Sequence, residues 1–265
     1  DATATVESLP LIASSVMSKK LASGSDCIVL DVTTGNGAFM KDRKQALELA
    51  KKMVTIGNLA GKKTIAQLTS MEEPLGFAVG NNLEVKEAID ALHGNGPEDL
   101  MTVCYTLAAH MISLGKNISC EAAVKEAKES VESGRAFDTF VKMVKMQGGD
   151  TSYILSPETF PVSPVQEELK AQNPGYLTYI NTEGVGTAAG ILGAGRSKKE
   201  DDIDPCAGII LHKKLGQKVE AGESLATLYT SDKSLLDAGI RHLETCYEIK
   251  NVPESVPELI QECIF

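Results

Sequence analysis

A strand, a helix and a second strand follow one another between residues 26 and 68 of this 265-residue chain, and they constrain its fold more than any other feature. Residues 26–32 (DCIVLDV) are apolar and partly β-branched, which is typical of a buried strand. Residues 41–60 place apolar side chains at helical spacing, and residues 63–68 (KTIAQL) form a second strand-like run. Strands joined by a helix pair in parallel through a right-handed crossover. The sequence therefore predicts an α/β fold with a parallel or mixed sheet and flanking helices.

Glycine and proline mark the limits of further helices. Pro10 suits a first helical turn and Gly24 the position just after a last turn, so a helix is predicted over 10–22. Amphipathic spacing predicts four more helices, over 83–94, 97–116, 120–134 and 136–148. A Pro- and Ser-rich stretch at 150–166 predicts a linker or a surface loop.

The last third of the chain changes character. Short β-branched or aromatic runs broken by glycine predict strands within 175–192, 207–219 and 223–230. A last helix is predicted over 234–250, followed by a Pro-punctuated tail. The segment 216–230 (GQKVEAGESLATLYT) is typical of barrel-sandwich modules that carry biotin or lipoate, but no hairpin presents a modifiable lysine.

This change in pattern predicts an α/β core over residues 23–155, after the helix predicted at 10–22. Residues 156–265 are predicted to form a C-terminal α+β unit with a barrel-sandwich-like β pattern.

Composition excludes several classes of protein. The chain has 26 Lys and Arg against 36 Asp and Glu, a net charge of −10, which argues against a nucleic-acid partner. It has no apolar run of roughly 18 residues, so no membrane span is predicted. Its six cysteines form no CxxC pair. They are interpreted as reduced, buried thiols of a cytoplasmic protein, with a disulfide framework as the alternative.

Two glycine-rich segments leave their function open. GNGAF (35–39) follows a strand and is either a tight turn or an incomplete phosphate cradle, since a third glycine is missing. GAGR (193–196) is either a glycine turn with a solvated arginine or an anion site. None of the four histidines pairs with a nearby nucleophile in the sequence, so the residues alone predict no catalytic centre.

The helix predicted over 10–22 carries a mixed stripe of side chains. Ile12, Ser15, Val16 and Lys19 lie at helical spacing and combine an apolar wall, a hydroxyl and an ammonium. Such a surface suits a flat heterocycle with carbonyl oxygens, because serine donates or accepts and lysine donates to oxygen. The alternative is a lysine that interacts with the helix C-terminus beside a half-buried serine.

Three segments of the chain resemble the pyrimidine-nucleoside and thymidine phosphorylases, in collinear order over the full length. They are 1–40 (which contains SSVMSKK), 73–100 (EPLGFAVGNNLEVKEAIDALHGNGPEDL) and 192–225 (LGAGRSKKEDDIDPCAGIILHKKLGQKVEAGESL). The second and third are more similar to the broad-specificity pyrimidine-nucleoside enzymes. The resemblance implies reversible phosphorolysis of uridine or thymidine to the free base and a (deoxy)ribose 1-phosphate.

The resemblance also assigns residues. It implies that Lys19 contacts the pyrimidine and that Ser15 hydrogen-bonds the ring edge, with Ile12, Val16 and Phe39 near the base. It implies a K⁺ ion bound by Leu75, Ala78 and Glu87, and no organic cofactor. It identifies no catalytic residue within this chain.

The same resemblance implies that the chain is about two-thirds of a longer homodimeric enzyme. Residues 1–22 would be the remnant of its helical dimerisation and base-binding domain, and the phosphate ligands would lie upstream. The 265-residue chain alone is then expected to show no phosphorolysis. Two alternatives remain: a non-catalytic module that binds a nucleoside or a protein partner, with a carrier-like β domain, and a biotin- or acyl-carrier-like domain.

Overall fold

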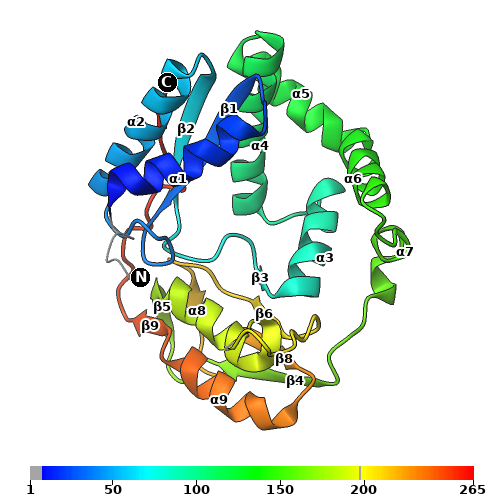
Figure 1. Ribbon diagram of the computed structural model, residues 1–265. Coiled ribbons are helices and arrows are strands. Elements are labelled where there is room, and N and C mark those ends of the chain that lie inside the picture. Colours follow the sequence, from blue (N-terminus) through cyan, green and yellow to red (C-terminus); the bar gives the residue numbers. More distant parts are fainter. Residues whose placement is uncertain (1–7, 197) are drawn as a thin grey trace. The chain divides into compact units, whose positions relative to one another are not determined.

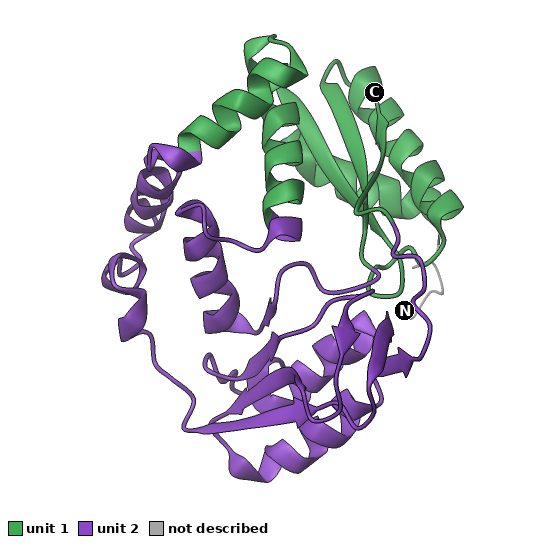
Figure 2. Cartoon of the chain, turned by 180° about the vertical axis from the view of Figure 1, so that it is seen from behind, with its two compact units in different colours: residues 1–71, 101–130, 258–265 green, residues 72–100, 131–257 purple. Residues whose placement is uncertain are grey.

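The computed structural model describes residues 8–196 and 198–265, and the chain divides into two compact units. Unit 1 comprises residues 1–71, 101–130 and 258–265, and unit 2 comprises residues 72–100 and 131–257 (Figures 1 and 2). Residues 1–7 of the predicted helical part lie outside the described residues.

The sheet of unit 1 confirms the predicted strand–helix–strand unit. Strands β1 (Cys27–Thr34) and β2 (Lys63–Ser70) pair in parallel and are connected by helix α2 (Arg43–Leu59). The C-terminal strand β10 (Ile260–Ile264) adds to the other edge of β2 in the antiparallel direction, so the sheet is mixed. The α/β class is therefore confirmed.

Helices α1 and α2 share one apolar core with this sheet. Helix α1 (Leu9–Ala22) buries Ala13 and Met17 in the same core as Leu30 and Leu68 of the sheet. Helix α2 begins at Asp42, whose Oδ1 accepts a 2.9 Å hydrogen bond from the Gln45 N–H and so satisfies a free donor of the first turn. Helices α4 (Glu98–Lys116) and α5 (Cys120–Glu132) supply most of the remaining residues of unit 1.

A buried histidine of α4 contacts this sheet. The Nε2 atom of His110 lies 3.3 Å from Oε1 of Gln67 on β2 and 3.7 Å from Sγ of Cys263 on β10. Burial lowers the pKa of His110 below its ordinary value of 6.5, because the charged imidazolium loses water. No carboxylate is among these contacts to offset that loss.

This lowered pKa predicts a pH-dependent stability. The unfolded chain binds the proton of His110 more tightly than the folded chain, so the free energy of unfolding should fall as the pH decreases below 6.5. The slope contributed by one such group is at most about 1.4 kcal/mol per pH unit. Urea denaturation of the wild type and of His110→Gln between pH 7.5 and pH 5.5 (roughly one unit on either side of the ordinary histidine pKa) measures it. A stability difference that stays constant over this range would contradict the prediction.

Unit 2 contains two antiparallel sheets with helices beside them (Figure 1). One sheet has the order β3–β6–β8–β4 and the other β7–β5–β9. The strands are β3 (Ala78–Val79), β4 (Val165–Lys170), β5 (Gly175–Ile180), β6 (Gly208–Leu211), β7 (Lys218–Val219), β8 (Ser224–Thr230) and β9 (Tyr247–Lys250). The helices are α3 (Asn81–Leu92), α6 (Arg135–Met146), the single turns α7 (Ser152–Leu155) and η1 (Pro157–Thr159), α8 (Thr182–Ala189) with its π-helical extension η2 (Gly190–Ala194), and α9 (Lys233–Glu244).

Three predicted elements of the C-terminal part are wrong. Residues 182–194 form helix α8 and its extension, although their glycines and threonines suggested strands. Asn181 caps this helix, because its side-chain oxygen accepts a hydrogen bond from the Gly184 N–H at 2.9 Å. Glycine at 184 lets the helix pack against Cys246, since a Cβ there would lie 2.6 Å from the Sγ atom of Cys246. The predicted helix over 234–250 ends at Glu244 and turns back as β9, and the predicted tail contains β10.

Other expectations from the sequence meet the structure only in part. All six cysteines are free thiols, as expected, but only Cys246 is fully buried, and Cys104 and Cys120 are exposed. In the two described ranges, the helices are all too short or too polar to cross a membrane. The predicted domain limits at 22/23 and 155/156 stay predictions, because compact units interleaved along the chain do not test them.

Candidate functional site

The apolar part of the predicted stripe lines a cavity in unit 1. Ile12 and Val16 of α1 are half-buried, and they lie with Phe39 at a cavity of about 460 Å³. Phe39 follows β1 in the turn 35–39, and its side chain is 59% exposed at the cavity. Helical spacing groups Ile12 with Val16, and the family resemblance added Phe39; the structure brings all three to one cavity, and their contact with a base stays a prediction.

The polar part of the stripe lies differently. Ser15 and Lys19 are exposed and are not among the residues that line the cavity, whereas Lys20 is. Lys20 lies four residues after Val16 and eight after Ile12, so it shares their helix face. Helical spacing could have indicated Lys20 as well, and the assignment of Lys19 to the base stays a prediction.

Strand β1 adds a carboxyl group to the same cavity. Asp31 and Thr33 line it, and Oδ1 of Asp31 accepts a 2.6 Å hydrogen bond from the Thr69 hydroxyl. Surrounding protein atoms displace water from the Asp31 carboxyl and raise its pKa, while the hydrogen bond from Thr69 opposes that shift. The cavity therefore combines apolar walls, an ammonium and a hydrogen-bonding carboxyl group, which together suit a flat polar heterocycle.

Three backbone N–H groups of the turn 35–39 donate hydrogen bonds to backbone carbonyls of the chain. The Gly35 N–H donates to the Met40 carbonyl at 3.2 Å, Gly37 to Met71 at 2.9 Å and Ala38 to Gly35 at 3.0 Å. Because these donors are satisfied by backbone carbonyls, the tight-turn interpretation of GNGAF is favoured over a phosphate cradle.

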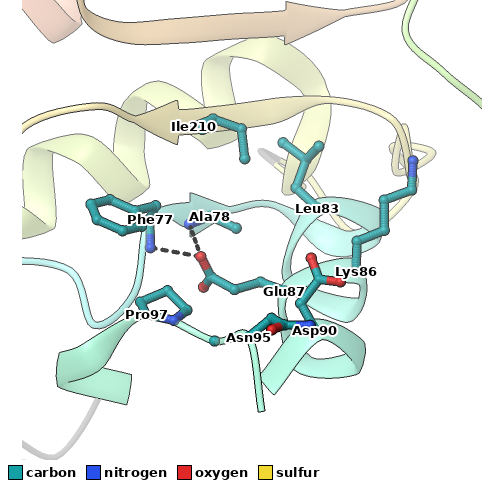
Figure 3. A pocket seen from close by; sticks show the side chains of 10 residues that line it. Phe77, Ala78, Leu83, Lys86, Glu87, Asp90, Asn95, Pro97 and Ile210 are labelled. Atoms are coloured by element: carbon teal, nitrogen blue, oxygen red, sulfur yellow. Dashed lines mark hydrogen bonds between the residues drawn. The ribbon is translucent and has the colours of Figure 1, made fainter. Parts of the chain in front are cut away.

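The predicted K⁺ ligands lie together in unit 2. Oε1 of Glu87, on α3, accepts from the N–H groups of Phe77 at 2.8 Å and Ala78 at 3.1 Å (Figure 3). Burial raises the pKa of Glu87, and the two backbone hydrogen bonds oppose the shift. Gly76 has a φ of +69°, and a Cβ there would lie 2.2 Å from Oε2 of Glu87. The carboxylate thus packs directly against the turn that contains Leu75.

Strand pairing directs the Ala78 carbonyl toward the same side. The Leu211 N–H donates to the Phe77 carbonyl at 2.8 Å, and Ala78 lies opposite Ile210 in the antiparallel ladder. Hydrogen-bonding positions alternate along such a ladder, so the N–H and C=O of Ala78 both face away from β6. The Ala78 N–H is bonded to Glu87 on that side, and the Ala78 carbonyl is therefore directed to the side where the Glu87 carboxylate lies.

The residues of this turn fit a hard monovalent cation. A carboxylate and backbone carbonyls are oxygen donors, which such cations prefer. Ala78 and Glu87 also line a cavity of about 480 Å³. Lys86 and Asp90 of α3 and Asn95 of the loop that follows α3 line the same cavity (Figure 3). Across residues 8–196 and 198–265, no three side chains of His, Cys, Asp or Glu are grouped to hold a metal ion, so carbonyl groups would have to complete a site.

Comparison with known proteins identifies the family. The model of the glycosyl transferase family a/b domain matches residues 2–137, and that of the pyrimidine nucleoside phosphorylase C-terminal domain matches residues 176–250. These matches show that the chain belongs to the glycosyl transferase family that has this a/b domain. Its C-terminal part is similar to the C-terminal domain of pyrimidine nucleoside phosphorylases.

Curated relatives agree with that assignment. The chain is 48% identical over 265 residues to a pyrimidine-nucleoside phosphorylase of Geobacillus stearothermophilus. This alignment covers 100% of the chain and 61% of the relative. It is 49% identical over 236 residues to one of Bacillus subtilis strain 168, covering 89% of the chain and 54% of the relative. A pyrimidine-nucleoside phosphorylase of Staphylococcus haemolyticus is 46% identical over 265 residues, at 100% and 61% coverage. The chain thus spans about three-fifths of the length of the relatives that it matches throughout.

Proposed function

We propose that the protein containing this chain catalyses the reversible phosphorolysis of pyrimidine nucleosides. Inorganic phosphate attacks C1′ of uridine or thymidine, the glycosidic bond breaks, and the products are the free base and a (deoxy)ribose 1-phosphate. The observation that carries this proposal is the cavity of α1 and β1, where Ile12, Val16 and Phe39 provide apolar walls for a flat base. The relatives of the same name, 46–49% identical to this chain, support it.

The roles of the polar residues follow from the charge that the reaction develops. As the base departs it gains negative charge, and an ammonium that donates to its oxygen stabilises that charge in the transition state. We assign this role to Lys19. The Ser15 hydroxyl can hydrogen-bond the ring edge, because it lies one helical turn before Lys19 on the exposed side of α1.

The proposal includes a K⁺ ion held by the Leu75 and Ala78 carbonyls and the Glu87 carboxylate. The directed Ala78 carbonyl and the partly buried Glu87 carboxylate support it. The ion would fix the turn that carries these ligands. Its absence is expected to lower the melting temperature.

A homodimer and a cytoplasmic location belong to the same proposal. The six free thiols fit a reducing compartment. Sedimentation of the full-length gene product measures the oligomeric state.

The reaction is tested directly with the full-length gene product. Incubation with uridine and inorganic phosphate should release uracil and ribose 1-phosphate in equal amounts, with no uracil when phosphate is left out. Thymidine is tested in parallel. Base release that does not depend on phosphate would indicate a hydrolase, and binding of uridine without any release would indicate a non-catalytic nucleoside-binding module. Either result would overturn the proposal.

A further inference from the structure

One partly buried lysine links the turn 73–79, which carries two of the proposed cation ligands, to the loop between β6 and β7. Lys214 lies in the loop between β6 and β7. Its Nζ atom donates to Oδ2 of Asp99 at 2.7 Å and to the Pro74 carbonyl. The ammonium also lies 5.4 Å from the centre of the Phe77 ring, within the range of a cation–π interaction.

The partner of Lys214 contacts the turn itself. Oδ2 of Asp99 also accepts a 3.0 Å hydrogen bond from the Gly76 N–H, between Leu75 and Ala78. A second link runs beside it, since the Leu215 N–H donates to Oε2 of Glu73 at 2.8 Å. The Lys214 and Asp99 side chains are only 11% and 22% exposed, so water screens this ion pair much less than the surface pairs of the chain.

The pair acts on the turn through position more than through net charge. Burial is the main cause of the raised pKa of Glu87, and the hydrogen bonds from Phe77 and Ala78 oppose it. Asp99 raises that pKa further and Lys214 lowers it, so their charges oppose each other at the carboxylate. The pair therefore affects the turn mainly through its hydrogen bonds. The Lys214 ammonium binds the Pro74 carbonyl and the Asp99 carboxylate binds the Gly76 N–H, so the backbone is held on both sides of Leu75.

We propose that Lys214 and Asp99 are the positioning residues of the cation site. They hold the turn 73–79 in the conformation that directs the Leu75 and Ala78 carbonyls toward Glu87. This inference rests on the proposed function, because it assumes that K⁺ binds at this turn. Lys214 and Asp99 are not themselves ligands in this proposal.

The test removes both charges together. Removing Lys214 alone would leave the Asp99 carboxylate uncompensated near the cation and could strengthen binding by charge alone. The double variant Lys214→Met, Asp99→Asn keeps the net charge and similar side-chain volumes. In the full-length protein we expect its affinity for K⁺ to fall about tenfold, the effect of losing one coupled pair in a network. Titration of KCl against choline chloride at constant ionic strength, followed by the shift in melting temperature, measures this affinity.

A second measurement separates positioning from general destabilisation. In the double variant the amide hydrogens of Gly76 and Phe77 should exchange with solvent at least about tenfold faster, while those of β8 keep their protection. The matched control is Lys218→Met, Glu220→Gln, a 2.7 Å ion pair a few residues after Lys214 whose side chains are 63% and 65% exposed. It should change K⁺ affinity less than twofold (roughly the effect of a surface ion pair).

The outcomes distinguish the two proposals. If the wild type shows no K⁺-specific stabilisation, the cation site is wrong and the positioning role falls with it. If the wild type binds K⁺ and the double variant binds it equally well, only the positioning role is overturned. Should the double variant fail to fold, the decisive measurement is amide exchange at Gly76 in Asp99→Asn, because the uncompensated Lys214 ammonium would weaken K⁺ binding by charge alone. That exchange is expected to be at least about threefold faster than in the wild type, and unchanged exchange would overturn the inference.

Discussion

Replacing Lys19 by Met in the full-length protein is expected to lower kcat/KM for phosphorolysis of uridine by about 10²–10³-fold. This is the usual effect of removing one hydrogen-bond donor that stabilises charge in a transition state. The methionine keeps most of the side-chain volume and a good helix propensity, and residue 19 is exposed on α1, so folding should change little. The initial rate of uracil release at several uridine concentrations measures the effect. The loss should lie in kcat as well as in kcat/KM.

The neighbouring lysine provides a matched control with a distinct outcome. Lys20 lines the cavity with Ile12 and Val16, whereas Lys19 does not. If Lys19 has the proposed role, Lys20→Met should reduce kcat/KM only a few-fold, by weakening one wall of the cavity (roughly 0.5–1 kcal/mol, as for an exposed charged contact). A larger loss for Lys20→Met than for Lys19→Met would show that Lys20 is the lysine that contacts the base.

Replacing Gly76 by Ala should destabilise unit 2 and the cation site together. An L-residue at a φ of +69° costs about 1–2 kcal/mol. The new Cβ would also displace the Glu87 carboxylate, which lies 2.2 Å from that position and accepts from Phe77 and Ala78. Hydrogen bonds to a charged group contribute about 1.5–3 kcal/mol. We therefore expect a loss of roughly 2.5–5 kcal/mol in the free energy of unfolding, measured by urea denaturation in choline chloride.

Gly148→Ala separates the two causes. Gly148 follows α6 with a φ of +77°, and a Cβ there would meet no atom within 4 Å. This variant should therefore show only the backbone cost of about 1–2 kcal/mol. Equal losses for both glycines would mean that the Glu87 carboxylate moves aside freely, contrary to the role given to it. Gly76→Ala should also abolish the stabilisation by KCl, whereas Gly148→Ala should keep it.

The fold could be predicted from sequence where local signals agreed with tertiary packing. The α1–β1–α2–β2 segment and helices α3–α6 were predicted within two or three residues, because their apolar spacing is strong and Gly or Pro marks their limits. The wrong predictions lie in segments whose residues have only a weak preference for helix or strand. The glycine-rich segment 182–194 is helical because Asn181 caps it and Gly184 allows Cys246 to approach, and neither contact is visible in a sequence window.

The candidate site was predictable to the same extent. Ile12 and Val16 could be grouped because they are one helical turn apart, whereas Phe39 was added only by the family resemblance; all three line one cavity. Leu75, Ala78 and Glu87 were implied by the family resemblance, and their proximity was not visible in the residues themselves. Lys214 and Asp99 were missed because they are separated by 115 residues, and nothing in either segment indicates that the other lies beside it.

The position of β10 has a consequence for how the protein is made. The strand consists of Ile260–Ile264, yet it completes the sheet that β1 and β2 form far earlier in the sequence. Unit 1 therefore cannot complete its sheet until residues 260–264 have left the ribosome, after residues 131–257 of unit 2 have been synthesised. A stop codon just before Ile260 should thus expose the edge of β2 and leave a chain prone to aggregation or degradation, although α1 and the proposed cation ligands lie before it in the sequence.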